Sequence, residues 1–236
     1  MNQEDGKRIT PTRIQKLIAG RMLTSKQTQP CFYMTAKADI SKINETRRPL
    51  SKQLGVRISF NDFIIRAIAL AVEQNPLMKG IFKDDFIELA ETVNVGLAVA
   101  APKGLVVPVV KDANNKSLVQ IAKETNELIE KSKANKLTLD DLTGACTTLT
   151  ALGMFGIDSF LAIPSPGQCS IVSIGIISEQ PVVSNGKIEI KKLIEFGLAA
   201  DNRIVSADYG AKFLTDITSL VAEPEKLLGD ESSNRD

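Results

Sequence analysis

The order in which helix-like and strand-like segments follow one another is the feature of this sequence that most restricts its fold. Strand patterns occur singly, in hairpin pairs and after helices, and no strict strand–helix alternation runs along the chain. A doubly wound nucleotide-binding sheet needs that alternation, whereas a mixed sheet accommodates hairpins as well as crossovers. We therefore expect an α/β (α+β) fold, built as a sandwich of a mixed sheet and flanking helices.

Five segments have apolar residues at helical spacing. Thr12 with Gln15, and Ser117 with Gln120, form capping-box pairs ahead of two of them. Pro49 is expected to interrupt or kink another, because a proline inside a helix lacks the amide donor. The predicted helices cover the region from Thr12 to the proline at 30, residues 41–54, residues 62–75 with Asn61 as cap, a stretch opened by Ser117, and residues 207–222 with Ser206 as cap. The apolar stripe of the first helix consists of Ile14, Leu17, Ile18 and Met22.

Strand patterns account for most of the remaining chain. The segment CFYMTAKAD alternates between apolar and polar residues, as a half-buried strand does. Asn185–Gly186, between two further strand-like runs, is the signature of a two-residue hairpin. The predicted strands cover residues 31–39, 93–100, 105–110, about 145–150, about 168–178, and the run from the hairpin to about residue 199.

The sequence contains no histidine, and this absence restricts its chemistry. A Ser–His–Asp or Cys–His nucleophile is excluded. The cysteines, Cys31, Cys146 and Cys169, lack CxxC spacing, so we expect no zinc site and a reducing intracellular compartment. Neither a glycine-rich dinucleotide loop nor a P-loop motif is present.

Charge and hydropathy point away from nucleic acid and membranes. The 29 basic and 28 acidic residues are well mixed and leave a formal charge of +1. No apolar run reaches the roughly 18 residues that a membrane-spanning helix needs. A chain of 236 residues can bury a sizeable core. We expect a flexible segment over residues 1–9, one core domain over residues 10–228, and a polar tail over residues 229–236.

Five segments, taken together and in order, resemble the catalytic core of the dihydrolipoamide acyltransferases, which form the core of 2-oxo acid dehydrogenase complexes. The segments are RIQKLIAGRMLTSKQTQP (13–30), VRISFNDFIIRAIALA (56–71), VNVGLAVAAPKGLVVPVVKDANNKSLVQIA (93–122), LTALGMFGIDSFLAIPSPGQCSIVSIG (149–175) and ADNRIVSADYGAKFLTDITSLVAEPEKLL (200–228). The resemblance covers the catalytic core alone. It implies a chloramphenicol-acetyltransferase-like mixed-sheet sandwich with flanking helices.

The resemblance also implies a reaction, the transfer of an acyl group between dihydrolipoamide and coenzyme A. In the family, the histidine of a DHRxxDG motif takes the proton of the thiol, and a serine hydroxyl in an ISxLG segment stabilises the oxyanion. These two groups come from neighbouring subunits of a trimer. A base is needed because a free thiol, with a pKa of about 8.5, is only a few per cent ionised near neutrality.

This chain departs from the family pattern at each catalytic position. Alignment on Asp201 and Arg203 without a gap places Asn202 at the catalytic histidine and Ser206 at the aspartate of the motif. The oxyanion serine falls on Thr150, which keeps a hydroxyl but adds a methyl group. A second histidine common in the family falls on Cys31. Because asparagine cannot accept a proton at physiological pH, we expect Asn202, Ser206 and Thr150 to be non-functional in catalysis.

Each residue of this region also has a plain structural interpretation. Asn202 either orients a substrate by hydrogen bonds or only satisfies local backbone groups. Asp201 and Arg203 are expected to form a structural ion pair, and Ser206 to cap the last helix. Asp208 is a candidate replacement base, although a carboxylate in the first helical turn also suits the helix dipole.

Cysteine and phenylalanine side chains near these segments are expected to be structural. Cys169 lies in an apolar run and is expected to be inert core. Cys31 has no basic neighbour in the sequence that would lower the pKa of its thiol. Phe155, Phe160 and Phe213 are expected to belong to the core rather than to stack on a substrate.

The expected function is that of a catalytically inactive or strongly impaired acyltransferase-like core, acting as a structural scaffold subunit of a pyruvate dehydrogenase-type complex. In lacking the histidine it resembles the core of the dihydrolipoamide dehydrogenase-binding protein. The alternative is a residual acyltransferase that moves an acyl group between coenzyme A and dihydrolipoamide or another thiol. A third alternative is a module that binds coenzyme A without turning it over.

The resemblance implies a homotrimer that forms a larger shell or assembles with active acyltransferase subunits. Neither nucleic acid nor a membrane is an expected partner. No cofactor is required, and coenzyme A is the one ligand that the resemblance allows. The expected location is the bacterial cytoplasm or the mitochondrial matrix.

Overall fold

The computed structural model describes residues 8–102 and 104–228. Most of the predicted flexible segment, residues 1–9, lies outside the described residues. The predicted polar tail, residues 229–236, lies outside them entirely. The helices are α1 (Arg13–Thr28), α2 (Ser41–Leu54), α3 (Phe60–Gln74), α4 (Leu118–Lys133), α5 (Ala207–Ala222) and α6 (Glu225–Leu228), with short 3-10 turns at Pro76–Lys79, Ala113–Asn115, Asp140–Leu142 and Gly153–Phe155. The strands are β1 (Cys31–Asp39), β2 (Gly80–Lys83), β3 (Phe86–Leu89), β4 (Val95–Leu97), β5 (Val99–Ala101), β6 (Gly104–Val106), β7 (Val109–Val110), β8 (Thr147–Ala151), β9 (Ser170–Ile174), β10 (Ser178–Ser184) and β11 (Lys187–Asp201).

The main sheet is mixed, as the sequence predicts. Its strand order is β1-β11-β9-β8-β4-β7, and β10 pairs with the first half of β11. β8 runs parallel to β9 and β4, whereas β11 runs antiparallel to β1, β9 and β10. The pairs β2–β3 and β5–β6 form separate two-stranded hairpins. Parallel and antiparallel pairing thus coexist in one sheet, so the doubly wound alternative is excluded.

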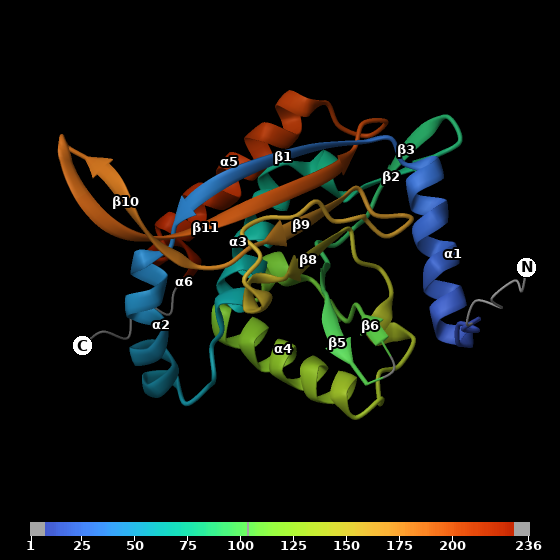
Figure 1. Ribbon diagram of the computed structural model, residues 1–236, viewed down its shortest axis with the longest axis horizontal. Helices are drawn as coiled ribbons and strands as arrows, with labels where there is room; N and C mark the ends of the chain where they lie inside the picture. The colour runs from blue at the N-terminus through green and yellow to red at the C-terminus, as the bar shows by residue number, and fades with distance from the viewer. Residues whose placement is uncertain (1–7, 103, 229–236) are drawn as a thin grey trace, which may run out of the picture.

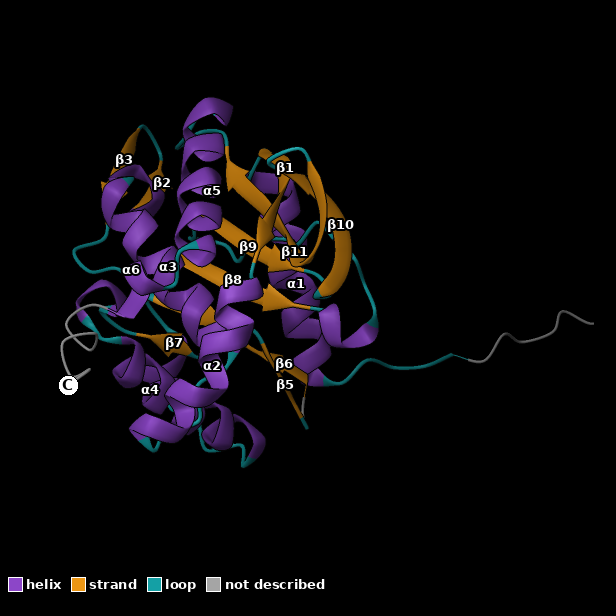
Figure 2. Cartoon of the chain, turned by 90° about the vertical axis from the view of Figure 1, so that its left-hand side faces the viewer, coloured by secondary structure: helices purple, strands orange, loops and turns teal. Residues whose placement is uncertain are grey.

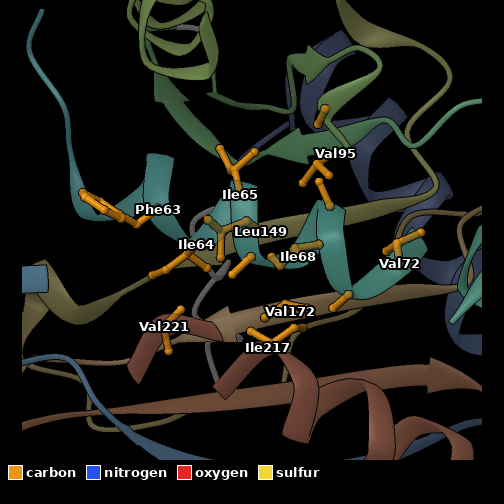
Figure 3. Close-up of a cluster of buried hydrophobic side chains, with 14 of the residues drawn as sticks. Phe63, Ile64, Ile65, Ile68, Val72, Val95, Leu149, Val172, Ile217 and Val221 are labelled. Carbon is orange, nitrogen blue, oxygen red and sulfur yellow. The ribbon is translucent and has the colours of Figure 1, made fainter. Parts of the chain in front are cut away.

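Helices α3 and α5 cover one face of this sheet (Figures 1 and 2). α3 is apolar almost all round, which suits a helix that lies between the sheet and other helices. Figure 3 shows its Ile68 beside Leu149 of β8 and near Val172 of β9, whereas Ile65 points away from these two strands. Each such aliphatic side chain, when fully buried, stabilises the fold by about 1.5–3 kcal/mol. The core therefore holds β8 and β9 rigidly from the helical side.

Two helical details differ from the expectations. α3 is capped by Ser59, whose hydroxyl accepts from the backbone of Asp62, and not by Asn61. The capping box needs its acidic partner three residues after the cap, and Asp62 meets that requirement only for Ser59. α2 continues through Pro49 over its whole predicted range. Proline removes one amide donor only, and the buried Ile43 anchors this helix in the core.

Helix α1 begins with the predicted Thr12–Gln15 capping box, but its apolar stripe does not enter the core of this chain. Leu17 is 64% exposed and Ile14 is 41% exposed, and Ser25 is the one buried residue of the helix. Figure 1 shows α1 at one end of the molecule. The stripe of α1 is therefore a surface feature of the single chain.

Candidate functional site

The turn between β11 and α5 carries Asn202 and Ser206, two of the residues that the sequence predicts at the positions of the expected motif. β11 ends at Asp201, and the amide of Asp201 donates to the Cys169 carbonyl at 2.9 Å. The amides of Ile204 and Val205 donate back to the Asp201 carbonyl at 3.0 and 3.1 Å, and this closes the turn. Backbone hydrogen bonds thus hold the turn from the end of β11 to Val205.

Asp201 and Arg203 form the expected structural ion pair. Nε of Arg203 lies 3.0 Å from Oδ1 and 3.2 Å from Oδ2 of Asp201, and NH2 lies 2.6 Å from Oδ2. The backbone amide of Arg203 donates to Oδ1 as well, at 3.0 Å. Asp201 is completely buried, and the guanidinium also stacks on Phe82 with its carbon 4.6 Å from the ring centre. A carboxylate with so many donors is committed to the structure of the turn.

Asn202 and Ser206 differ from their neighbours because both are exposed. The amide of Asn202 donates to the Pro30 carbonyl at 3.0 Å, which leaves its side chain free to face solvent. Ser206 occupies the expected cap position of α5, but its side chain makes no capping hydrogen bond. Asn202 could therefore carry another side chain without loss of a side-chain hydrogen bond, whereas the Ser206 hydroxyl still bonds to the carboxylate of Asp208.

Asp208, the candidate replacement base, is exposed in the first turn of α5. A hydrogen bond from the Ser206 hydroxyl, assisted by backbone amides at the helix start, lowers the pKa of Asp208. A carboxylate with a lowered pKa accepts a proton from a thiol less readily than an ordinary one. This environment disfavours Asp208 as a general base.

Cys31 pairs with Asp201 across β1 and β11 and is half-buried. Burial raises the pKa of its thiol, and the negative charge of Asp201 raises that pKa further. The structure also brings Lys26 and Arg203 close enough to oppose the shift, so basic neighbours exist that the sequence did not reveal. The balance still favours the neutral thiol, which is a poor nucleophile.

A small cavity of about 170 Å³ lies beside this turn. It is lined by residues from the end of α1, from β2, from the segment before β9 and from the turn itself, namely Thr28, Gln29, Ile81, Phe82, Pro166, Gly167, Gln168, Asp201, Arg203 and Ile204. A cavity of this size accommodates the end of a substrate chain but not a whole cofactor.

Thr150 is half-buried near the end of β8. It pairs with Ser173 of β9, which pairs in turn with Gly197 of β11. The Ser173 hydroxyl donates to the carbonyl of Phe160 at 2.7 Å, so the segment that follows β8 returns across this part of the sheet. The hydroxyl of Thr150 therefore lies on the sheet face opposite the one covered by α3.

The strand register places Thr150 and Asn202 at opposite ends of the sheet. Thr150 is level with Gly197, and Asn202 follows five residues later in the direction of β11. At about 3.3 Å per residue along the strand and about 4.8 Å between strands, the two positions lie roughly 15–20 Å apart. Figure 1 shows β8 and β11 pointing in opposite directions. Within one chain, these residues cannot contact the same reacting atoms.

The expected core residues separate into two groups. Cys169 and Phe213 are fully buried, and burial strongly raises the pKa of the Cys169 thiol, as expected of an inert core cysteine. Phe160 is half-buried. Phe155 is 74% exposed, so its assignment to the core was wrong. Phe155 is the last residue of the 3-10 turn that follows β8, and no residue of that turn is buried.

A buried polar network near the site was not predicted. Oγ of Ser25 lies 2.8 Å from Oε1 of Gln29 and 2.7 Å from the Pro164 carbonyl oxygen. Nε2 of Gln29 donates to the Gln168 carbonyl at 3.0 Å, and the Thr148 hydroxyl donates to Oε1 of Gln168 at 2.7 Å. This network joins α1 to β8. In the sequence, this network was indicated only by Ser25 and Gln29, two polar residues spaced four apart at the end of α1.

Residues 8–102 and 104–228 contain neither a metal-binding cluster nor a membrane-spanning helix. No cluster of histidine, cysteine, aspartate or glutamate side chains in these ranges could hold a metal ion. No helix in the same ranges has the length and apolar character needed to cross a membrane.

Comparison with known proteins gives one consistent family. Residues 3–229 match the family described as 2-oxoacid dehydrogenases acyltransferase (catalytic domain). The dihydrolipoyllysine-residue acetyltransferase component of the pyruvate dehydrogenase complex of Rickettsia felis is 36% identical over 231 residues, which are 96% of this chain and 56% of that protein. This chain thus spans about half the length of the curated relatives it matches.

Solved structures agree with the sequence match. A probable dihydrolipoamide acetyltransferase from Listeria monocytogenes superposes with a TM-score of 0.88 at 29% identity, over 97% of this chain and 98% of that one. The dihydrolipoamide acetyltransferase of Azotobacter vinelandii, studied for the catalytic roles of a serine, a histidine and an asparagine, gives 0.88 at 27% identity, over 94% and 93%.

Chloramphenicol acetyltransferase is similar in fold alone, with a TM-score of 0.52 at 12% identity over 86% of this chain and 94% of that one. The predicted fold class is therefore confirmed. Together with the family match over nearly the whole chain, this places the protein in the 2-oxoacid dehydrogenase acyltransferase (catalytic domain) family.

Proposed function

We propose that this chain is the acyltransferase-type core of a pyruvate dehydrogenase-type complex, and that it serves as a homotrimeric scaffold with little or no catalytic activity. One observation carries the proposal. An asparagine, Asn202, stands exposed at the position where the family's general base is expected, in a chain without any histidine.

The distances in sequence between Thr150, Asn202 and Ser206 support the placement of Asn202 at the position of the general base. In the Azotobacter vinelandii enzyme the named histidine lies 52 residues after the named serine, and the named asparagine lies four residues after the histidine. Thr150, Asn202 and Ser206 have the same spacing in this chain. This equal spacing supports the placement of Thr150, Asn202 and Ser206 at those three positions, each with a different residue.

The chemistry at these positions supports a loss of function. Removal of a general base typically lowers a rate by about 10²–10⁴-fold. The side chains nearby do not replace the base, because Asp208 has a lowered pKa and Asp201 is bound by Arg203. Cys31 has a raised pKa and is mostly protonated near neutrality. A thiol substrate would thus remain protonated in this site.

The scaffold role is supported by what the chain retains. The core and the Asp201–Arg203 pair are intact, and the relatives of the chain include pyruvate dehydrogenase components of the bacterium Rickettsia felis and of the mitochondria of Dictyostelium discoideum. A solved relative, 27% identical, is a cubic pyruvate dehydrogenase core. Because Thr150 and Asn202 lie at opposite ends of one sheet, a complete site needs a second copy. A ring of three copies meets that need.

Residual acyl transfer is the second candidate, and Thr150 is the observation that favours it. Its hydroxyl remains at the end of β8, where it could still donate to an oxyanion. In that case coenzyme A and dihydrolipoamide, or another thiol, would be the substrates. Three free cysteines fit a reducing compartment, the bacterial cytoplasm or the mitochondrial matrix.

The decisive experiment is a steady-state assay of acetyl transfer from acetyl-CoA to dihydrolipoamide. We expect no turnover above background in the wild type, and recovery by about 10²-fold or more in the double variant Asn202→His, Ser206→Asp. The matched control is Asn202→Gln, Ser206→Asp, which has similar bulk but no base. Wild-type turnover comparable to that of an active relative, abolished by Thr150→Ala, would contradict the scaffold proposal.

Calorimetry with coenzyme A separates binding from turnover. Measurable affinity without acetyl transfer would identify a coenzyme A-binding module. Recovery of activity in the histidine variant would further show that the substrate channel is open and that only the catalytic groups were lost.

A further inference from the structure

The three cysteines of the chain lie in one row at the end of the main sheet, whose strands β1, β11, β9 and β8 lie side by side in that order (Figure 1). Cys31 of β1 is level with Asp201 of β11. The amide of Asp201 donates to the Cys169 carbonyl at 2.9 Å, and the amide of Cys169 donates to the Cys146 carbonyl at 3.2 Å. Side chains that are level on neighbouring strands point to the same face of a sheet. The row therefore brings three thiols and one carboxylate to the same face.

Cys146 and Cys169 are direct neighbours in this row. They precede Thr147 and Ser170, which are level in the parallel strands β8 and β9. Adjacent strands are about 4.8 Å apart, and a disulfide needs Cα atoms that are roughly 4.4–6.8 Å apart. The Cα spacing of this pair is therefore suited to a disulfide.

Cys31 is excluded as a partner in such a bond. Asp201 stands between Cys31 and Cys169, so two strand spacings, about 10 Å, separate the Cα atoms of these two cysteines. Cα atoms more than about 7 Å apart cannot be bridged unless the backbone moves. Cys31 is also half-buried, whereas Cys146 and Cys169 are buried. The row thus consists of one close pair and one separate thiol.

The thiol of Cys146 is directed to another neighbour while the pair is reduced. Its Sγ lies 3.2 Å from the carbonyl oxygen of Asn94, to which the thiol donates. A thiol is a weak donor, so this bond opposes rotation of the side chain towards Cys169 only weakly. Oxidation therefore needs a change of side-chain rotamer rather than a change of strand register.

A cavity next to the pair gives a small oxidant a place to bind. Gln168, which precedes Cys169 in the chain, and Asp201, which is level with Cys169 in the sheet, both line the cavity of about 170 Å³. A water molecule takes up roughly 30 Å³, so the cavity holds several molecules of the size of water or hydrogen peroxide. It is too small for a tripeptide disulfide such as oxidised glutathione. The site therefore favours a peroxide as the oxidant.

We propose that Cys146 and Cys169 form a peroxide-sensitive dithiol that closes to a disulfide. One thiol, as its thiolate, attacks a peroxide oxygen, the O–O bond breaks, and a sulfenic acid and water are formed. The sulfur of the second cysteine then attacks the sulfenic sulfur, the S–O bond breaks, a second water leaves, and the S–S bond forms. Overall the two thiols lose two electrons and two protons, and hydrogen peroxide is reduced to water.

The disulfide links the start of β8 to the start of β9. The loop that it closes contains Thr150 and the segment that returns across the sheet to Phe160, and the link restricts the motion of both. Burial raises the pKa of both thiols, so the reactive thiolate is scarce. The pair thus responds to sustained rather than brief oxidation. It is independent of the proposed function, because neither Thr150 nor Asn202 takes part in the reaction.

The oxidised thiols are identified by peptide mapping of the full wild-type chain, so no buried residue has to be replaced. The folded protein is treated with hydrogen peroxide, and the remaining free thiols are alkylated in denaturant. Cys146 and Cys169 lie in one tryptic peptide, residues 137–187, and a second cleavage before Asp158 separates them unless they are linked. We expect the number of alkylated cysteines to fall from three to one, which is Cys31, and dithiothreitol to restore all three.

The matched control is Cys31→Ala, which should form the same cross-link at the wild-type rate. Folding of the chain should slow oxidised glutathione at least about tenfold more than it slows peroxide, when each rate is compared with that of the urea-unfolded chain. Equal slowing of the two oxidants would show that the pair reacts only in unfolded molecules, and would overturn the proposal. Oxidation of Cys31 alone, with Cys146 and Cys169 still alkylated, would also overturn it.

Discussion

Asp201 and Asn202 are neighbours in the chain, but their environments are opposite. The carboxylate of Asp201 is completely buried and is bound by the guanidinium and the amide of Arg203. Asn202 is exposed, and its backbone alone is fixed, by the Pro30 carbonyl. Ser206 resembles Asn202, since it is exposed and makes no capping bond. The same turn thus contains positions that hold the fold and positions that face solvent.

If the catalytic activity is lost, as we propose, this difference explains how the fold is kept. A residue that touches a substrate must be exposed to the channel, so its replacement costs the single chain few contacts. A residue that shapes the turn is buried, so its replacement leaves an unpaired group in the core. We infer that the family's catalytic positions can change in a chain like this one while its turn stays the same.

Replacement of Arg203 by methionine should have the largest effect on stability. It leaves the buried carboxylate of Asp201 without its charged partner, which typically costs about 3–5 kcal/mol. The free energy of unfolding is measured by urea titration at one fixed protein concentration. Arg21→Met, in the exposed part of α1, is the matched control and should change stability little. A loss below about 1 kcal/mol for Arg203→Met would show that the pair does not hold the turn.

The pKa of the Cys31 thiol depends on the charged side chains of the same turn. Because Asp201 raises the pKa of the Cys31 thiol, Asp201→Asn should lower that pKa and speed alkylation at pH 8, by roughly threefold to tenfold. Lys26 acts in the opposite direction, so Lys26→Gln should slow the reaction. Rates are followed with a thiol-specific reagent, and the site is identified by mass spectrometry. Equal rates in both variants would contradict the assigned electrostatics.

Local features of this protein were predictable from the sequence. The capping boxes at Thr12 and Ser117 and the hairpin at Asn185–Gly186 each depend on residues a few positions apart. The cap of α3 was misplaced by two residues, because Ser59 and Asn61 are both good caps and only the position of Asp62 distinguishes them. Patterns of this kind locate elements well and their ends less well.

The arrangement of the site was not predictable in the same way. The distance between Thr150 and Asn202 follows from the register of three strands, and the link from Gln29 to Gln168 joins residues 139 positions apart. Phe155 was misjudged for a related reason, and the exposed apolar stripe of α1 illustrates the same point. Apolar character indicates that a side chain will be buried, but not whether its own chain or a second copy buries it.

The smallest predicted effects belong to the exposed positions of the turn. Asn202→Ala and Ser206→Ala should each change the free energy of unfolding by no more than about 0.5 kcal/mol. Ser117→Ala is the sharpest control, because Ser117 makes the capping bond that Ser206 lacks and its loss should cost about 1 kcal/mol. All three are measured by the same urea titration. If Ser206→Ala cost as much as Ser117→Ala, Ser206 would be a fold-holding residue, and the division between buried and exposed positions in this turn would fail.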